Sequence, residues 1–113
     1  MKKLTGFQQK GVCEEIAASL EVRLFCCNMF YSGKALNISP AGMFISTKKC
    51  IPAGSIFLVL FRVDNGLLKA FVKVKEAIIT NGSCEGIDVE VLNQNQSYLK
   101  FVKSLNQPEK LPV

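Results

Sequence analysis

Three residues near the middle of the chain have the types and the spacing of a small polar binding loop. Asn37, Ser39 and Gly42 lie between two apolar runs, so they fall in a turn between two expected strands. The turn offers an amide, a hydroxyl and, at the glycine, a backbone that no Cβ shields. Asn and Ser in turns often bond their own backbone, so a purely structural turn is the alternative interpretation.

The rest of the chain offers little other chemistry. It has no His and no Trp, and no C-x-x-C pair or glycine-rich phosphate loop, so a zinc site has no plausible ligand set. A general base would have to be a carboxylate such as Asp64 or Asp88, and neither lies in a recognisable catalytic arrangement. The sequence therefore indicates a protein that is not an enzyme and needs no metal or cofactor.

Length and composition indicate one ordinary folded domain. The chain has 113 residues, of which 49% are hydrophobic and 20% are charged. No apolar stretch reaches the roughly 20 residues of a membrane helix. The charged start, residues 1–10, is not followed by the apolar segment of a secretory leader. We therefore expect a cytoplasmic protein that does not insert into a membrane.

The cysteines are expected to be reduced. There are five, an odd number, and Cys26 and Cys27 are adjacent, which suits no disulfide ladder. The other three stand alone in apolar surroundings: Cys13, Cys50 and Cys84. Isolated Cys of this kind is usually a small buried hydrophobe. The alternative is a reactive Cys50, whose thiolate form Lys48 and Lys49 would favour.

The positive net charge favours anionic partners, but the scarcity of arginine disfavours specific recognition of nucleotides. The formal net charge is +5, from 14 basic and 9 acidic residues. Only Arg23 and Arg62 are arginines, and the remaining basic residues are lysines. Lysine supplies a diffuse field, whereas arginine supplies the planar fork that recognises a phosphate or a guanine edge.

Period-two alternation predicts six strands that form an antiparallel barrel or sandwich. We expect the strands at residues 20–26, 34–37, 42–46, 55–63, 67–80 and 86–92. Residues 28–33 look like a turn, and the pairs Asn65-Gly66 and Asn81-Gly82 are strong signals for tight hairpins.

One helix is predicted at the end of the chain. Tyr98, Phe101, Val102 and Leu105 recur at helical spacing. The candidates for its N-cap are Asn93, Asn95 and Ser97. We expect this amphipathic helix to close one end of the barrel rather than to bind a partner.

The order of these elements resembles that of the PilZ domain family. Asn37-x-Ser39-x-x-Gly42 is similar to the family's [D/N]-x-S-x-x-G motif, and a hairpin precedes it as in that family. Residues 51–55, which contain Pro and Gly, resemble the turn after the motif, and residues 86–91 resemble a later strand. The resemblance covers roughly residues 20–105. It implies a mainly β fold, a six-stranded antiparallel PilZ-type barrel with a C-terminal α-helix.

The resemblance also implies a ligand. PilZ domains are known mainly as bacterial receptors for cyclic di-GMP, whose guanine and ribose-phosphate meet the motif. By position, Asn37 would bond a guanine edge, Ser39 would act through its hydroxyl, and Gly42 would let the backbone approach.

The second half of the family's site, an R-x-x-x-R arm before the first strand, is missing. The arm would fall near residues 11–15, which contain Glu14 and Glu15 and no arginine. Lys10 and Arg23 are the candidate substitutes, although Arg23 lies inside an expected strand. Bidentate contacts from Arg to guanine contribute ~1–3 kcal/mol each. Losing two would weaken binding by ~10²–10⁴-fold.

Two functions follow as hypotheses. The first is a non-enzymatic PilZ-type signalling domain, a cyclic di-GMP receptor or an adaptor with weak or lost affinity that acts through protein contacts, as some type IV pilus-associated family members do. The alternative is a small basic barrel that binds single-stranded nucleic acid through Lys69, Phe71, Lys73 and Lys75 on one strand face. A single aromatic side chain, Phe71, offers little surface on which bases could stack, so nucleic acid is the less favoured partner.

We also expect a division of the chain into three parts: an N-terminal arm over residues 1–19, the barrel with its helix over residues 20–105, and a flexible tail over residues 106–113.

Overall fold

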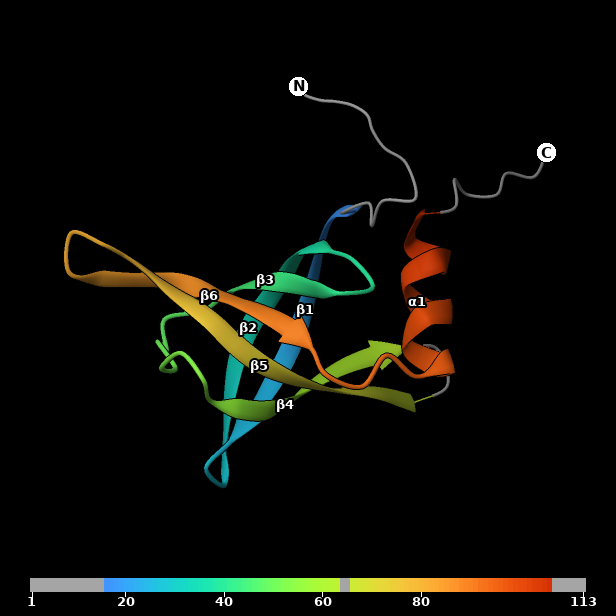
Figure 1. Cartoon of the computed structure of the whole chain (residues 1–113), viewed down its shortest axis with the longest axis horizontal. Coiled ribbons are helices and arrows are strands. Elements are labelled where there is room, and N and C mark those ends of the chain that lie inside the picture. The colour runs from blue at the N-terminus through green and yellow to red at the C-terminus, as the bar shows by residue number, and fades with distance from the viewer. Residues whose placement is uncertain (1–15, 64–65, 107–113) are drawn as a thin grey trace.

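The computed structural model describes residues 16–63 and 66–106, which form a closed barrel and one helix (Figure 1). The strands are β1 (Ile16–Cys26), β2 (Met29–Ile38), β3 (Gly42–Ser46), β4 (Ile56–Val63), β5 (Gly66–Thr80) and β6 (Ser83–Val91). All neighbours pair antiparallel in the order β1-β2-β3-β6-β5-β4, and β4 returns to β1. The predicted fold class is confirmed.

The strands close because their alternating side chains supply one continuous apolar interior. On β5, Ala70, Val72 and Val74 are buried while Phe71 and Lys73 between them are exposed. This is the alternation predicted from the sequence. The same pattern on β1 and β4 buries Leu24 and Val59, which face each other across the seam of the barrel.

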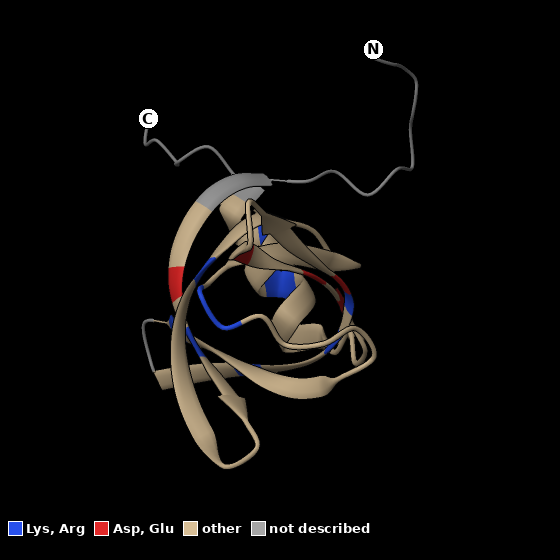
Figure 2. Ribbon diagram, turned by 90° about the vertical axis from the view of Figure 1, so that its left-hand side faces the viewer, with Lys and Arg blue, Asp and Glu red and all other residues tan. Residues whose placement is uncertain are grey.

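Helix α1 (Gln96–Asn106) covers one end of the barrel, as predicted (Figure 2). The backbone N–H of Tyr98 donates to Asn95 Oδ1 at 2.8 Å, so Asn95 is the N-cap among the three candidates. Tyr98 and Phe101 pack against Phe61 of β4, with ring centroids 6.4 and 5.1 Å away. The hairpin of β5 and β6 extends from the opposite end (Figure 1).

Three strands begin several residues earlier than expected, and one of them is β6, which starts at Ser83 instead of residue 86. β2 starts at Met29, so the turn predicted over residues 28–33 is wrong. The chain reverses at Cys27 and Asn28, which both have positive φ, 54° and 62°, without the glycine that usually signals such a turn. β1 starts at Ile16. The three-part division of the chain stays a prediction, because most of both proposed end segments lies outside the described residues.

The expectation of reduced cysteines is wrong for two of them. Cys50 and Cys84 form a disulfide with their Cα atoms 5.6 Å apart, so Cys50 is not the reactive thiol of the alternative interpretation. The bond joins the segment between β3 and β4 to β6. Cys26 and Cys27 are free thiols, and Cys13 lies outside the described residues. Disulfides persist mainly in oxidising compartments, so this bond lends no support to a cytoplasmic location, which stays a prediction.

No helix within residues 16–63 and 66–106 has the length and apolar character needed to cross a membrane.

We predict that the disulfide stabilises the fold substantially. It closes a loop with a sequence separation of 34, and a loop of that size is worth about 3–4 kcal/mol in the chain-entropy description. Urea unfolding with and without a phosphine reductant should show that loss, and Cys84→Ala should show it without reductant. Alkylation that labels all five cysteines in the unreduced, denatured protein would contradict the bond.

Candidate functional site

The polar motif forms a tight turn between β2 and β3. The Ser39 N–H donates to the Gly42 carbonyl at 2.8 Å, which closes the turn. Asn37 precedes it with φ 51° in the left-handed region, where Asn is one of the few tolerated side chains. Its side chain is exposed, and no hydrogen bond to it is found within the described residues. Asn37 is therefore the motif residue that can reach outward.

The Ser39 side chain is used by the turn itself. Its hydroxyl is within 3.1 Å of both the N–H and the carbonyl oxygen of Gly42, and the residue is only 7% exposed. The hydroxyl can accept from that N–H and donate to that oxygen. The alternative interpretation, in which the motif side chains bond the backbone of their own turn, is therefore correct for Ser39. It is not seen for Asn37 within the described residues.

Helix α1 fixes the turn from inside. The hydroxyl of Tyr98, a fully buried residue, donates to the Ser39 carbonyl at 2.6 Å. This bond joins residues 59 positions apart and links the helix to the motif. Burial raises the pKa of Tyr98 well above its usual value, because the ionised phenolate would have to be desolvated.

Gly42 is required by strand packing. A Cβ at this position would overlap the carbonyl oxygen of Val89 on β6, with which β3 pairs. The absence of a side chain therefore lets β3 and β6 approach. Backbone approach to a ligand is not needed to explain the glycine.

A small cavity opens beside the turn. Its volume is about 300 Å³, at the lower end of the range for ligand pockets. The lining residues are Asn37, Ser39, Ala41, Gly42, Met43, Phe44, Lys75, Asp88 and Val89. Lys75 Nζ lies 3.8 Å from Asp88 Oδ2, and both side chains are about half exposed. The cavity therefore offers an amide, a cation and a carboxylate.

Lys75 owes its position to an irregularity in β5. The register between β5 and β6 shifts between Val74 and Glu76, which leaves Lys75 outside the regular pairing. Such bulges often re-aim a side chain next to a site. From its sequence, Lys75 was expected on a regular strand face, and neither Lys75 nor Asp88 was associated with the motif. Asp88 was considered from the sequence only as a carboxylate that could act as a base and as part of a strand that resembles the family pattern.

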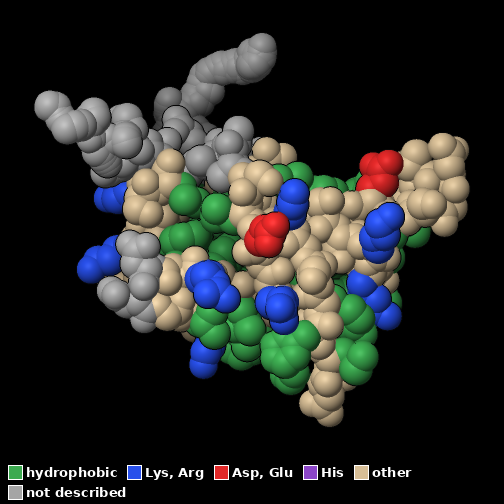
Figure 3. Space-filling model, turned by 180° about the vertical axis from the view of Figure 1, so that it is seen from behind, with side chains coloured by type: hydrophobic (Ala, Val, Ile, Leu, Met, Phe, Trp, Pro, Cys, Tyr) green, Lys and Arg blue, Asp and Glu red, His purple; other side chains and the backbone are tan. Residues whose placement is uncertain are grey.

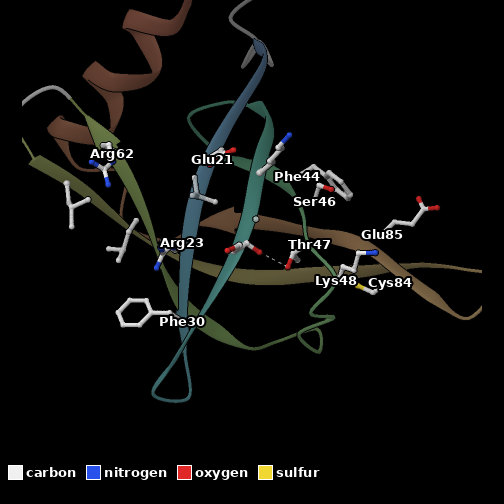
Figure 4. Close-up of a pocket in the computed structure, with 16 residues that line it drawn as sticks. Glu21, Arg23, Phe30, Phe44, Ser46, Thr47, Lys48, Arg62, Cys84 and Glu85 are labelled. Carbon is white, nitrogen blue, oxygen red and sulfur yellow. Dashed lines mark hydrogen bonds between the residues drawn. The ribbon is translucent and has the colours of Figure 1, made fainter.

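Among the described residues of the predicted site, Arg23 does not line this cavity. Arg23 projects from β1 into a separate, wider hollow of about 1270 Å³ (Figure 4). It pairs with Ser32 of β2, five residues from Asn37, or on the order of 17 Å along the strand. Lys10 lies outside the described residues. The structure thus brings together Asn37, Ser39 and Gly42, and keeps Arg23 apart from them.

Solved structures of other proteins share this fold. The PilZ domain of YcgR from Escherichia coli, solved with c-di-GMP, matches with a TM-score of 0.61 and 11% identity over 85% of this chain and 87% of that one. The PilZ domain of CeSA from a cellulose-synthesizing bacterium matches with a TM-score of 0.63 and 17% identity over 82% of this chain and 98% of that one. This chain has the PilZ fold. No protein-family profile and no curated protein matches its sequence.

The PilZ fold accounts for the element order on which the predicted resemblance was based. Within residues 16–63 and 66–106, no group of three or more His, Cys, Asp or Glu side chains is placed to hold a metal ion.

We predict that Gly42→Ala destabilises the fold by about 1–3 kcal/mol, because the added methyl overlaps the Val89 carbonyl and forces β3 away from β6. Urea unfolding measures the loss. Ala41→Ser, at the exposed neighbouring position, should stay within about 0.5 kcal/mol of the parent chain. Equal stability of the two variants would show that the strands tolerate the side chain.

We predict that Tyr98→Phe costs about 1–3 kcal/mol, because it leaves the Ser39 carbonyl buried without its donor. The pH dependence has a definite sign. The raised folded-state pKa favours neutral Tyr98, so its stabilisation is present below about pH 10 and is lost as the pH rises through the folded-state value. Unfolding at pH 8 to 11 should show a steeper alkaline loss for the parent and for Tyr31→Phe than for Tyr98→Phe.

Proposed function

We propose that this protein is a non-enzymatic PilZ-type signalling domain that binds cyclic di-GMP weakly beside the Asn37–Gly42 turn and acts through a protein partner. The observation that carries the proposal is the position of the turn: in a PilZ fold, the motif-bearing loop borders a cavity of ligand size. One matching structure contains c-di-GMP, which supports this class of ligand.

The side chains around the cavity suit a nucleotide with a guanine base. The Asn37 amide can both donate and accept, as a guanine edge requires. The Asp88 carboxylate can accept from ring or exocyclic N–H groups, and the Lys75 ammonium can neutralise a phosphate. In the free protein, Lys75 and Asp88 face each other, so a ligand would have to separate them.

We expect weak affinity for cyclic di-GMP because the cation that lines the cavity is a lysine, Lys75, and not an arginine. None of the described residues that line the cavity is an arginine, and Lys75 is a point charge that cannot form the bidentate contact. Ser39 and Gly42 are engaged in the turn and in strand packing, so neither adds a free side-chain contact. Lys10 stays a predicted contact.

We predict that cyclic di-GMP titrated into the full chain shifts the backbone amide resonances of Asn37, Lys75 and Asp88, with saturation ~10²–10⁴-fold above the concentration that a two-arginine site would need. Asn37→Ala should weaken binding by at least about tenfold.

The matched control is Asn93→Ala, an exposed Asn outside the cavity, which should bind like the parent chain. Absence of any shift at millimolar ligand would remove cyclic di-GMP from the proposal. Shifts that survive Asn37→Ala unchanged would move the ligand to another site.

A further inference from the structure

A row of large apolar side chains crosses four strands on the outside of the barrel. Phe30 of β2 pairs with Phe25 of β1, Phe25 pairs with Leu58 of β4, and Leu58 pairs with Phe71 of β5. Residues opposite each other in antiparallel strands share a face, with Cβ atoms about 5 Å apart. Their neighbours along β1, β4 and β5 point into the core, so this row points outward.

The row is exposed beyond what a free-standing barrel needs. Phe30 is 56% exposed and Phe71 is 52% exposed, at opposite ends of the row. Phe25 and Phe30 touch, with ring centroids 4.8 Å apart. Seen from behind in Figure 3, hydrophobic side chains gather near the lower edge of the molecule, beside the turn of the β1–β2 hairpin, with Lys and Arg next to them. Contiguous apolar surface of this kind marks interaction sites.

Two further rows beside the apolar one are rich in positive charge. The second row is Ser32, Arg23, Leu60 and Lys69, and the third contains Lys34, Glu21, Arg62 and Leu67. Both arginines of the chain are here. Four cations and one carboxylate give this outer face, defined by the three rows, a net charge of +3.

Part of the outer face is hollowed: residues of the second and third rows line the hollow, and of the apolar row only Phe30 does. The hollow of about 1270 Å³ is lined from this face by Glu21, Arg23, Phe30, Lys34, Leu60 and Arg62. Figure 4 shows Arg23 and Phe30 on the same side of the β1–β2 hairpin, with Arg62 on the neighbouring β4. A concave surface of apolar and cationic groups can enclose a segment of polypeptide.

We propose that this outer face is the docking site for a partner protein segment that carries carboxylates beside large apolar side chains. The inference deepens the adaptor role and rests on the proposed function for its biological meaning. The apolar row would bury the partner's apolar side chains, and Arg23 and Arg62 would pair with its carboxylates, for which the guanidinium fork is well shaped.

Other occupants fit the face less well. Single-stranded nucleic acid needs aromatic platforms, yet Leu58, Leu60 and Leu67 are aliphatic, and the rings of Phe25 and Phe30 are inclined at 44° to each other. A second copy of this chain would bring two faces of charge +3 together. A flat bilayer would not fill a hollow.

The test uses fluorescent peptides of about 12 residues and the full-length protein at about 0.15 M salt. One peptide alternates Glu with Leu and Phe, a second replaces each apolar residue by Ser, and a third replaces each Glu by Lys. We expect the first to bind at least about tenfold more tightly than either of the others. Its amide shifts should fall on the three rows.

Matched variants separate the docking face from general charge and general hydrophobicity. Phe71→Ser and Arg62→Glu should each weaken the first peptide by at least about tenfold. Ile79→Ser and Lys100→Glu, which make the same kinds of change at exposed positions elsewhere, should leave its affinity within about twofold. All four sites are solvent-exposed, and amide spectra will confirm that each variant is folded.

Three results would overturn the proposal. If the peptide with Ser in place of each apolar residue binds as tightly as the first peptide, the attraction is due to charge alone. If Ile79→Ser and Lys100→Glu weaken binding as much as Phe71→Ser and Arg62→Glu do, binding is not specific to the outer face. Tighter binding of an oligothymidine of about 12 nucleotides, or of vesicles with anionic lipid, that depends on Phe71 would assign the face to nucleic acid or membrane. Asn37→Ala should not affect the peptide, so failure at the nucleotide site and failure here are distinguishable.

Discussion

The barrel closes through the pairing of β1 with β4, and both its core and its outer surface follow from this closure. Four residue pairs, from Val22 with Phe61 to Phe25 with Leu58, close the barrel between strands that lie far apart in the sequence. Inside the seam, Leu24 and Val59 are fully buried, so closure completes the core. Outside it, the same register makes β2, β1, β4 and β5 one continuous surface. Closure also creates the barrel end that α1 covers.

The polar motif combines structural residues with one outward-facing residue. Ser39 holds the turn, Gly42 lets β3 approach β6, and the hydroxyl of Tyr98 anchors the turn to the helix. The outward chemistry then comes from Asn37 and from Lys75 and Asp88 on other strands. A chain can therefore retain such a motif for its fold, whatever its affinity for a nucleotide.

The two hollows of the barrel are neighbours. Phe44 of β3 lines both the small cavity at the motif and the wide hollow, and its ring lies where a side chain on Gly86 would be. Glycine at position 86 thus makes room for this shared wall. Phe44 is the residue that the two hollows share.

Local features of this protein could be predicted from its residues: the alternation of β5, the turn at Asn81-Gly82 (φ 53° and 79°), a helix cap among Asn93, Asn95 and Ser97, and a polar turn at Asn37. Each depends on residues within a few positions of one another, where period and turn chemistry act directly. Other features could be seen only in the folded chain: the Cys50–Cys84 bond, the Lys75–Asp88 pair, the hydrogen bond from Tyr98 to Ser39 and the apolar row across four strands. These depend on strand register, on a bulge and on barrel closure, which arise from packing between distant segments and leave no periodic trace in the sequence.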